Sequence, residues 1–141
     1  RTIGGDKVNQ LRHLRFFKTT DGVLDLMDRH RAILAPKFSR VSELFEQHLG
    51  GTGIASWTNP KGGYFLSLDV LDGTAKRVVQ LAQEAGVELT PAGAPHPYGK
   101  DPNDRTIRIA PSFPELPEVE QAAEGVALSV LVAASERLLE R

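Results

Sequence analysis

The spacing of hydrophobic residues predicts that the first long element of this chain is a helix. Between Asp21 and Leu49, apolar positions recur mostly three, four or seven residues apart, as on one face of an amphipathic helix. These positions are Val23, Met27, Leu34, Phe38, Val41, Phe45 and Leu49. Asp21 is a suitable N-cap and Gly50-Gly51 a suitable end. Pro36 lies inside the pattern, and we expect it to kink or split the helix because proline removes a backbone hydrogen bond.

Shorter runs of aromatic and β-branched residues predict strands in the rest of the chain. Residues 54–57 and 64–68 are separated by a turn-rich linker, which is typical of a β-hairpin. Residues 87–90 and 106–110 are two further strand candidates, on either side of a loop rich in proline and glycine. We therefore expect four short strands.

Two more helices complete the predicted order of elements. One lies between Thr74, a plausible N-cap, and Gly86, a plausible end. The last helix begins at Pro114 or Pro117 and keeps helical spacing of its apolar residues. The order helix, strand, strand, helix, strand, strand, helix predicts an α/β fold of the α+β-like kind. We expect a small sheet with packed helices and a long amphipathic helix leading into it.

Length, charge and cysteine content exclude several classes of protein. The chain has 141 residues, which is the size of one domain. Its 17 Lys and Arg against 18 Asp and Glu give a net charge of -1, which argues against a nucleic-acid partner. There is no cysteine, which excludes disulfides and agrees with a cytoplasmic location. The longest apolar run, residues 126–134, is far shorter than the roughly 20 residues that span a membrane, so no membrane partner is expected.

Most candidate chemical sites have simpler interpretations. The four histidines are not spaced as metal ligands, and we interpret them as surface residues. They are His13, His30, His48 and His96. Gly50-Gly51-Thr52-Gly53 lacks the Lys-Ser/Thr of a phosphate-binding loop, and no serine lies in a Gly-x-Ser-x-Gly motif. We assign no metal ligand and no catalytic residue.

Arg108 is the strongest candidate for a binding residue. Strand alternation places Ile107 and Ile109 on one face and Arg108 on the other. One interpretation is a solvent-facing arginine on a half-buried strand. The other is an anion-binding group, because a guanidinium on a rigid strand presents two parallel donors to a carboxylate.

Two motifs resemble a known family. The first is Thr90-Pro91-Ala92-Gly93-Ala94-Pro95-His96-Pro97-Tyr98-Gly99, followed by the strand Arg105-Thr106-Ile107-Arg108-Ile109-Ala110. The second is Asn59-Pro60-Lys61-Gly62-Gly63-Tyr64-Phe65. Together they resemble the C-terminal small domain of fold-type I, pyridoxal-phosphate-dependent aminotransferases, with the aspartate-aminotransferase-like group as the nearest match. In that family a Pro-Gly-x-x-Phe-Gly turn leads to a strand arginine that binds the substrate α-carboxylate. The resemblance therefore implies this substrate-binding role for Arg108.

The resemblance also implies what the rest of the protein does. The parent enzyme transfers an amino group between an amino acid, with aspartate and glutamate as candidates, and a 2-oxo acid. Its cofactor is pyridoxal 5'-phosphate, bound mostly through residues outside this chain. Lys7 follows Gly4-Gly5-Asp6, which does not match the family's Schiff-base lysine motif. We therefore expect no cofactor-binding residue here and no activity from this chain alone.

The domain assignment follows from the same resemblance. The chain begins with Arg1 and not with methionine, which favours a piece of a longer protein. We interpret residues 1–20 as a lead segment from a missing large domain and residues 21–141 as the small domain. The expected partners are that large domain and a second copy of the parent protein in a homodimer.

Two other functions remain open from the sequence. The first is a ligand-sensing module of a transcriptional regulator, because such regulators can carry an aminotransferase-like domain. It would keep Arg108 and bind its ligands without turnover. The second is a structural or interaction domain with no catalytic role, for which the motif match would be a coincidence.

Overall fold

The computed structural model describes residues 4–140 and divides the chain into two compact units. The first unit is Arg1–Ala35 and the second is Pro36–Arg141. Helix α2 (Thr20–Leu49) contributes residues to both, and the division falls immediately before its proline, Pro36. Each unit is described by itself.

The first unit is helical and has an exposed surface. Helix α1 (Lys7–Phe17) begins after Asp6, whose carboxylate accepts a hydrogen bond from the Asn9 N–H at 3.1 Å. No side chain of α1 is buried within the structure. The start of α2 is capped by the Thr19 hydroxyl, which accepts a hydrogen bond from the Gly22 N–H at 3.3 Å. The helix therefore begins one residue before the predicted cap, Asp21.

Pro36 does not split α2, because the helix continues through it to Leu49. A proline here leaves the carbonyl of Ala32 without its helical partner. Ala32 is exposed, so water can take the place of the missing N–H. Gly51, with φ of 71°, follows the end of the helix in the left-handed region, as the sequence predicts for a glycine stop.

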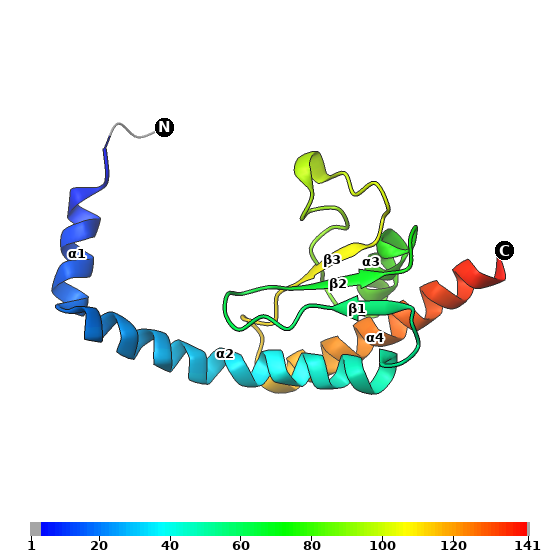
Figure 1. Cartoon of the computed structure of the whole chain (residues 1–141), viewed down its shortest axis with the longest axis horizontal. Helices are drawn as coiled ribbons and strands as arrows, with labels where there is room; N and C mark the ends of the chain where they lie inside the picture. The colour runs from blue at the N-terminus through cyan, green and yellow to red at the C-terminus, as the bar shows by residue number, and fades with distance from the viewer. Residues whose placement is uncertain (1–3, 141) are drawn as a thin grey trace. The chain divides into compact units, whose positions relative to one another are not determined.

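A three-stranded antiparallel sheet forms the centre of the second unit (Figure 1). Its strands are β1 (Ala55–Trp57), β2 (Leu66–Val70) and β3 (Thr106–Ile109), in the spatial order β1-β2-β3. Leu66 pairs with Ile109, and Ser67 pairs with Arg108. Burial alternates along β2 and β3, so one face of the sheet is apolar and packed while the other is polar.

Three helices pack against the apolar face of the sheet. They are the second half of α2, α3 (Ala75–Glu84) and α4 (Leu116–Leu139). Phe45 of α2 is fully buried and meets Trp57 of β1 edge to face, with ring centroids 5.7 Å apart. A capping box between Glu115 and Glu118 begins α4, whose first turn contains a proline as predicted. The α+β-like architecture expected from the sequence is confirmed.

One predicted strand is absent from the structure. Residues 87–90 have no strand assignment, and the sheet of the described part of the chain stops at three strands. The apolar residues of this segment, Val87 and Leu89, pack against the core from outside the sheet. The alternation of apolar and polar residues in this segment therefore reflects burial of one side of an irregular segment. The prediction of a strand was wrong because no neighbouring strand of the described residues pairs with residues 87–90.

None of the helices between residues 4 and 140 is long and apolar enough to cross a membrane.

We expect Leu68→Ala to lower the free energy of unfolding by about 2–5 kcal/mol, because this central side chain is 0% exposed and its removal leaves a cavity. Leu128→Ala is the matched control, since its side chain in α4 is 55% exposed. For that variant the expected loss is about 0.5 kcal/mol or less. Urea unfolding followed by circular dichroism measures both. Equal losses would contradict the assigned core.

Candidate functional site

Arg108 lies in the middle of β3, on the polar face of the sheet. Its neighbours Ile107 and Ile109 are buried in the core, so its side chain leaves the strand on the opposite side. It also lines a cavity of about 130 Å³ together with residues 87–90 and the first turns of α4. The alternation predicted from the sequence therefore holds, and the arginine is fixed on a regular strand.

The guanidinium of Arg108 is held against an aromatic ring. Its Cζ atom lies 4.6 Å from the ring centroid of Phe65, which is 49% exposed. This is the geometry of a cation–π contact, in which the ring attracts the positive charge to its face. Phe65 belongs to the glycine-rich motif before β2, so the contact joins the two motifs of the sequence.

The same guanidinium has an unsatisfied donor. The Nε atom of Arg108 is buried and has no hydrogen-bond partner in the described part of the chain. No carboxylate between residues 4 and 140 forms an ion pair with Arg108, whereas Arg40 pairs with Glu43 and Glu120 and Arg77 pairs with Glu136. Buried donors are normally paired, so this one marks a place where an acceptor is missing. A carboxylate fits it, because its two oxygens can accept from Nε and a terminal nitrogen together.

The loop before β3 is shaped by glycine. Gly93 has φ of 85°, and a Cβ atom there would lie 2.4 Å from the carbonyl oxygen of Gly99. The two parts of the loop can approach this closely only because residue 93 has no side chain. A short 3-10 helix, η1 (Pro97–Gly99), carries Tyr98, which is 97% exposed.

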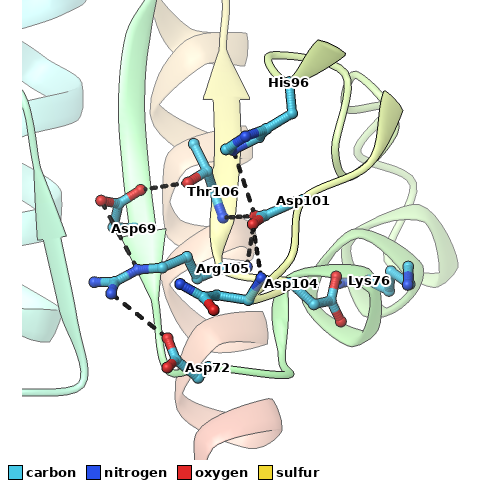
Figure 2. A network of polar contacts seen from close by, with 9 residues as sticks. Asp69, Asp72, Lys76, His96, Asp101, Asp104, Arg105 and Thr106 are labelled. Carbon is cyan, nitrogen blue, oxygen red and sulfur yellow. Dashed lines mark hydrogen bonds and ion pairs between the residues drawn. The ribbon is translucent and has the colours of Figure 1, made fainter. Parts of the chain in front are cut away.

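Asp101 joins this loop to the start of β3 (Figure 2). One carboxylate oxygen accepts hydrogen bonds from the backbone N–H groups of Arg105 and Thr106, both at 2.8 Å. The other accepts from the Asn103 N–H at 3.0 Å. The side chain is 4% exposed, and Nε2 of His96 lies 3.7 Å from it.

These bonds lower the pKa of Asp101 to about 2, with the Thr106 N–H as the largest cause. Its unfolded pKa is near 3.8, so the carboxylate binds fewer protons in the folded chain. The resulting stabilisation is complete above about pH 4 and is lost as the pH falls through about 2. Asp101 is therefore ionised at neutral pH.

The turn after β3 is held by a buried lysine. The amine of Lys37, in the second half of α2, donates hydrogen bonds to the carbonyl oxygens of Ser112, at 3.1 Å, and Pro114. Lys37 is the buried lysine of the described residues, and its amine donates to two backbone carbonyls. It is therefore a backbone-holding group and not a free amine for covalent chemistry.

The other residues considered in the sequence analysis have roles different from that of Arg108. Lys7 is the exposed first residue of α1. His13 and His30 are exposed, and His48 and His96 are half-buried. Two residues that the sequence analysis did not single out by themselves are Phe65 and Asp101. The aspartate had a local signal, because Asp-Pro is a turn initiator, whereas nothing local placed Phe65 on Arg108.

Comparison with known proteins places the chain in a family. The model of the family described as aspartate amino-transferase matches residues 1–141. A putative aminotransferase of Mycolicibacterium smegmatis is 60% identical over 139 residues, which are 99% of this chain and 32% of that protein. The similarity therefore extends over the whole sequence and includes the motifs around Phe65 and Arg108.

Solved structures agree with this placement. An aspartate transaminase of Corynebacterium glutamicum is 51% identical, with a TM-score of 0.91 over 97% of this chain and 32% of that one. An α-aminoadipate aminotransferase of Thermus thermophilus, 16% identical, shares the fold with a TM-score of 0.69 over 81% of this chain and 28% of that one. The chain spans about a third of the length of these relatives. It belongs to the aspartate aminotransferase family and has the fold of the small C-terminal domain of a fold-type I aminotransferase.

Proposed function

We propose that Arg108 binds the α-carboxylate of the amino-acid substrate in a pyridoxal-phosphate-dependent aminotransferase. The observation that carries the proposal is its guanidinium, which is fixed on β3 against Phe65 and has a buried Nε without a partner among the residues that the structure describes. An arginine in this state attracts a carboxylate and offers it two parallel donors. The family of the chain supports the same role.

The chain contributes binding and orientation to the reaction. Two hydrogen bonds from Arg108 hold a carboxylate in one plane, which restricts rotation of the carbon that carries the amino group. Phe65 covers one face of the Arg108 guanidinium, and this contact limits rotation of the guanidinium. Pyridoxal 5'-phosphate, when bound, supplies an electron sink for amino-group transfer. No proton transfer is assigned to a residue of this chain.

The groups that hold the cofactor are proposed to lie outside this chain. The buried lysine, Lys37, donates to two carbonyls, and Lys7 does not match the family motif. A longer protein with a large domain, acting as a homodimer, would supply the Schiff-base lysine and the phosphate-binding groups. On this proposal the 141-residue chain has no activity alone.

Aspartate and glutamate are the proposed amino donors, with 2-oxo acids as acceptors. The support is the name of the relative that is 51% identical, an aspartate transaminase. The relatives reported above are aminotransferases, and no feature of the described residues favours a ligand sensor of a transcriptional regulator.

The experiment that tests the function follows the absorbance of the full-length protein on addition of pyridoxal phosphate and then of aspartate or glutamate. We expect a cofactor band that shifts when the amino acid is added and shifts back with a 2-oxo acid. A cofactor band that never responds to an amino acid would favour the sensing function. Failure to bind cofactor would reject both.

Arg108→Leu in the full-length enzyme is expected to lower kcat/KM for the amino donor about 100-fold or more, because a charged pair of hydrogen bonds contributes about 3 kcal/mol or more. Arg108→Lys should recover only part of this, since an ammonium group lacks the planar fork. Steady-state kinetics measure both variants. An unchanged kcat/KM in Arg108→Leu would reject the proposed role.

Phe65→Leu is expected to raise KM for the amino donor about 2–5-fold, because a half-exposed cation–π contact contributes about 0.5–1 kcal/mol. Phe65→Tyr is the control, since it keeps the ring over the guanidinium and should stay close to the wild type. The same kinetic assay compares the two. Equal behaviour of the leucine and tyrosine variants would show that the ring does not support Arg108.

A further inference from the structure

We propose that Asp101 is a positioning residue for the carboxylate site, holding the first residue of β3 and so the direction in which Arg108 projects. The inference rests on the proposed function of Arg108 and adds a residue that touches neither substrate nor guanidinium. It follows from the connections between Asp101 and β3.

Asp101 binds the backbone at the point where β3 begins. Thr106 is the first residue of the strand, and its N–H and that of Arg105 converge on one oxygen of Asp101 at 2.8 Å each. The Asn103 N–H occupies the other oxygen at 3.0 Å. Three donors from one short segment are thus satisfied by a single carboxylate, which is shielded from water at 4% exposure.

The same segment is tied to β2 from its other side. The hydroxyl of Thr106 donates to the carboxylate of Asp69 at 2.9 Å, and the carbonyl of Arg105 accepts from the Val70 N–H at 2.9 Å. Figure 2 shows Asp101 and Asp69 on opposite sides of Thr106. The start of β3 is therefore held between two carboxylates.

A second set of bonds joins the segment to the start of α3. The carbonyl of Asn103 accepts from the Gly73 N–H at 2.8 Å, and that of Asp104 accepts from the Ala75 N–H at 2.9 Å. These bonds require the backbone conformation of residues 101–105, which the hydrogen bonds to the Asp101 carboxylate stabilise. Loss of Asp101 therefore loosens the attachment of the loop as well as the strand.

The register of β3 makes this attachment important for Arg108. The strand has four residues and pairs with one neighbour, so few ladder bonds fix its position. Arg108 is two residues beyond Thr106 and shares its face of the sheet. A shift of one residue would turn Arg108 toward the core, and a frayed strand start would let its guanidinium move away from Phe65.

Holding the start of β3 requires the carboxylate of Asp101 and not only a side chain of the same shape. An asparagine has the same size, but its amide offers one acceptor oxygen and points a donor at the other N–H groups. With asparagine at residue 101, the amide oxygen can serve either the Asn103 N–H or the N–H groups of Arg105 and Thr106, so Asp101→Asn leaves one side of this turn without an acceptor. His96, 3.7 Å away, is the titratable side chain that faces the carboxylate from the loop.

The test is a double-mutant cycle in the full-length enzyme, with kcat, KM and thermal unfolding as readouts. We expect Asp101→Asn to raise KM for the amino donor about 10-fold and to leave kcat within about 2-fold. In the Arg108→Leu background the same substitution should change kcat/KM less than 2-fold, because the residue acts through Arg108. The same fold-change in both backgrounds, or no change in KM, would overturn the proposal.

A matched control separates positioning from a general loss of stability. Glu136→Gln makes the same carboxylate-to-amide change at the ion pair of α3 with α4, where Arg77 binds Glu136 through two contacts of 2.8 Å. We expect it to lower the melting temperature without changing KM. A rise in KM equal to that of Asp101→Asn would show that both act only through stability.

A milder variant keeps the proposal testable when Asp101→Asn does not fold. Asp101→Ser keeps a side-chain oxygen that can accept from the N–H two residues on, as Asp101 does from Asn103, and removes the oxygen that accepts from Arg105 and Thr106. A rise in KM of about 2-fold or more at unchanged kcat supports control of Arg108 by the strand start. An unchanged KM would overturn it. Failure of the proposed function itself is distinct, because Arg108→Leu would then leave kcat/KM unchanged.

Discussion

The pairing of β2 with β3 is the constraint on which the site depends. Leu68 lies opposite Ile107, and Leu66 lies opposite Ile109, so burial of these side chains fixes one face of β3 toward the helices. The residue between the two isoleucines, Arg108, must then leave the sheet on the other side. Core packing and the direction of the guanidinium are thus set by one register.

Two buried charged side chains hold the ends of β3 in complementary ways. Before the strand, the Asp101 carboxylate accepts backbone N–H groups, and after it, the Lys37 amine donates to backbone carbonyls. Each charge meets the backbone dipoles of opposite sign that the short strand leaves unpaired. Both groups bind backbone next to the strand that carries Arg108.

Arg108 differs from Arg40 and Arg77 of the second unit. Arg40 and Arg77 bridge helices through Glu120 and Glu136 and are thereby neutralised within the fold. Arg108 is instead held by an aromatic ring, which restricts its motion, and within residues 4–140 its charge and its Nε donor have no partner. A guanidinium that is fixed in place and still lacks an anion is suited to bind one from outside.

The sequence by itself determined helices α2, α3 and α4, three of the strands and the face on which Arg108 lies, because these follow from local periodicity and from strong stop signals such as Gly51. Helix α1 was not among the predicted elements. The sequence also carried the family motifs. One prediction depended on a distant partner and was wrong: among the described residues, the strand expected at 87–90 has no neighbour to pair with. Pro36 does not split its helix, which continues to Leu49. Asp101 lay within local reach, since its acceptors serve N–H groups two to five residues away.

Only the tertiary structure decided what surrounds the guanidinium. Phe65 and Lys37 come from distant parts of the sequence, and no local pattern states that one covers Arg108 while the other secures the turn beyond it. The same holds for the buried, unpartnered Nε of Arg108, since burial depends on every segment that packs around an atom. Periodicity can choose the face of a strand, but contacts across the chain determine whether a charge on that face is neutralised or left free to bind.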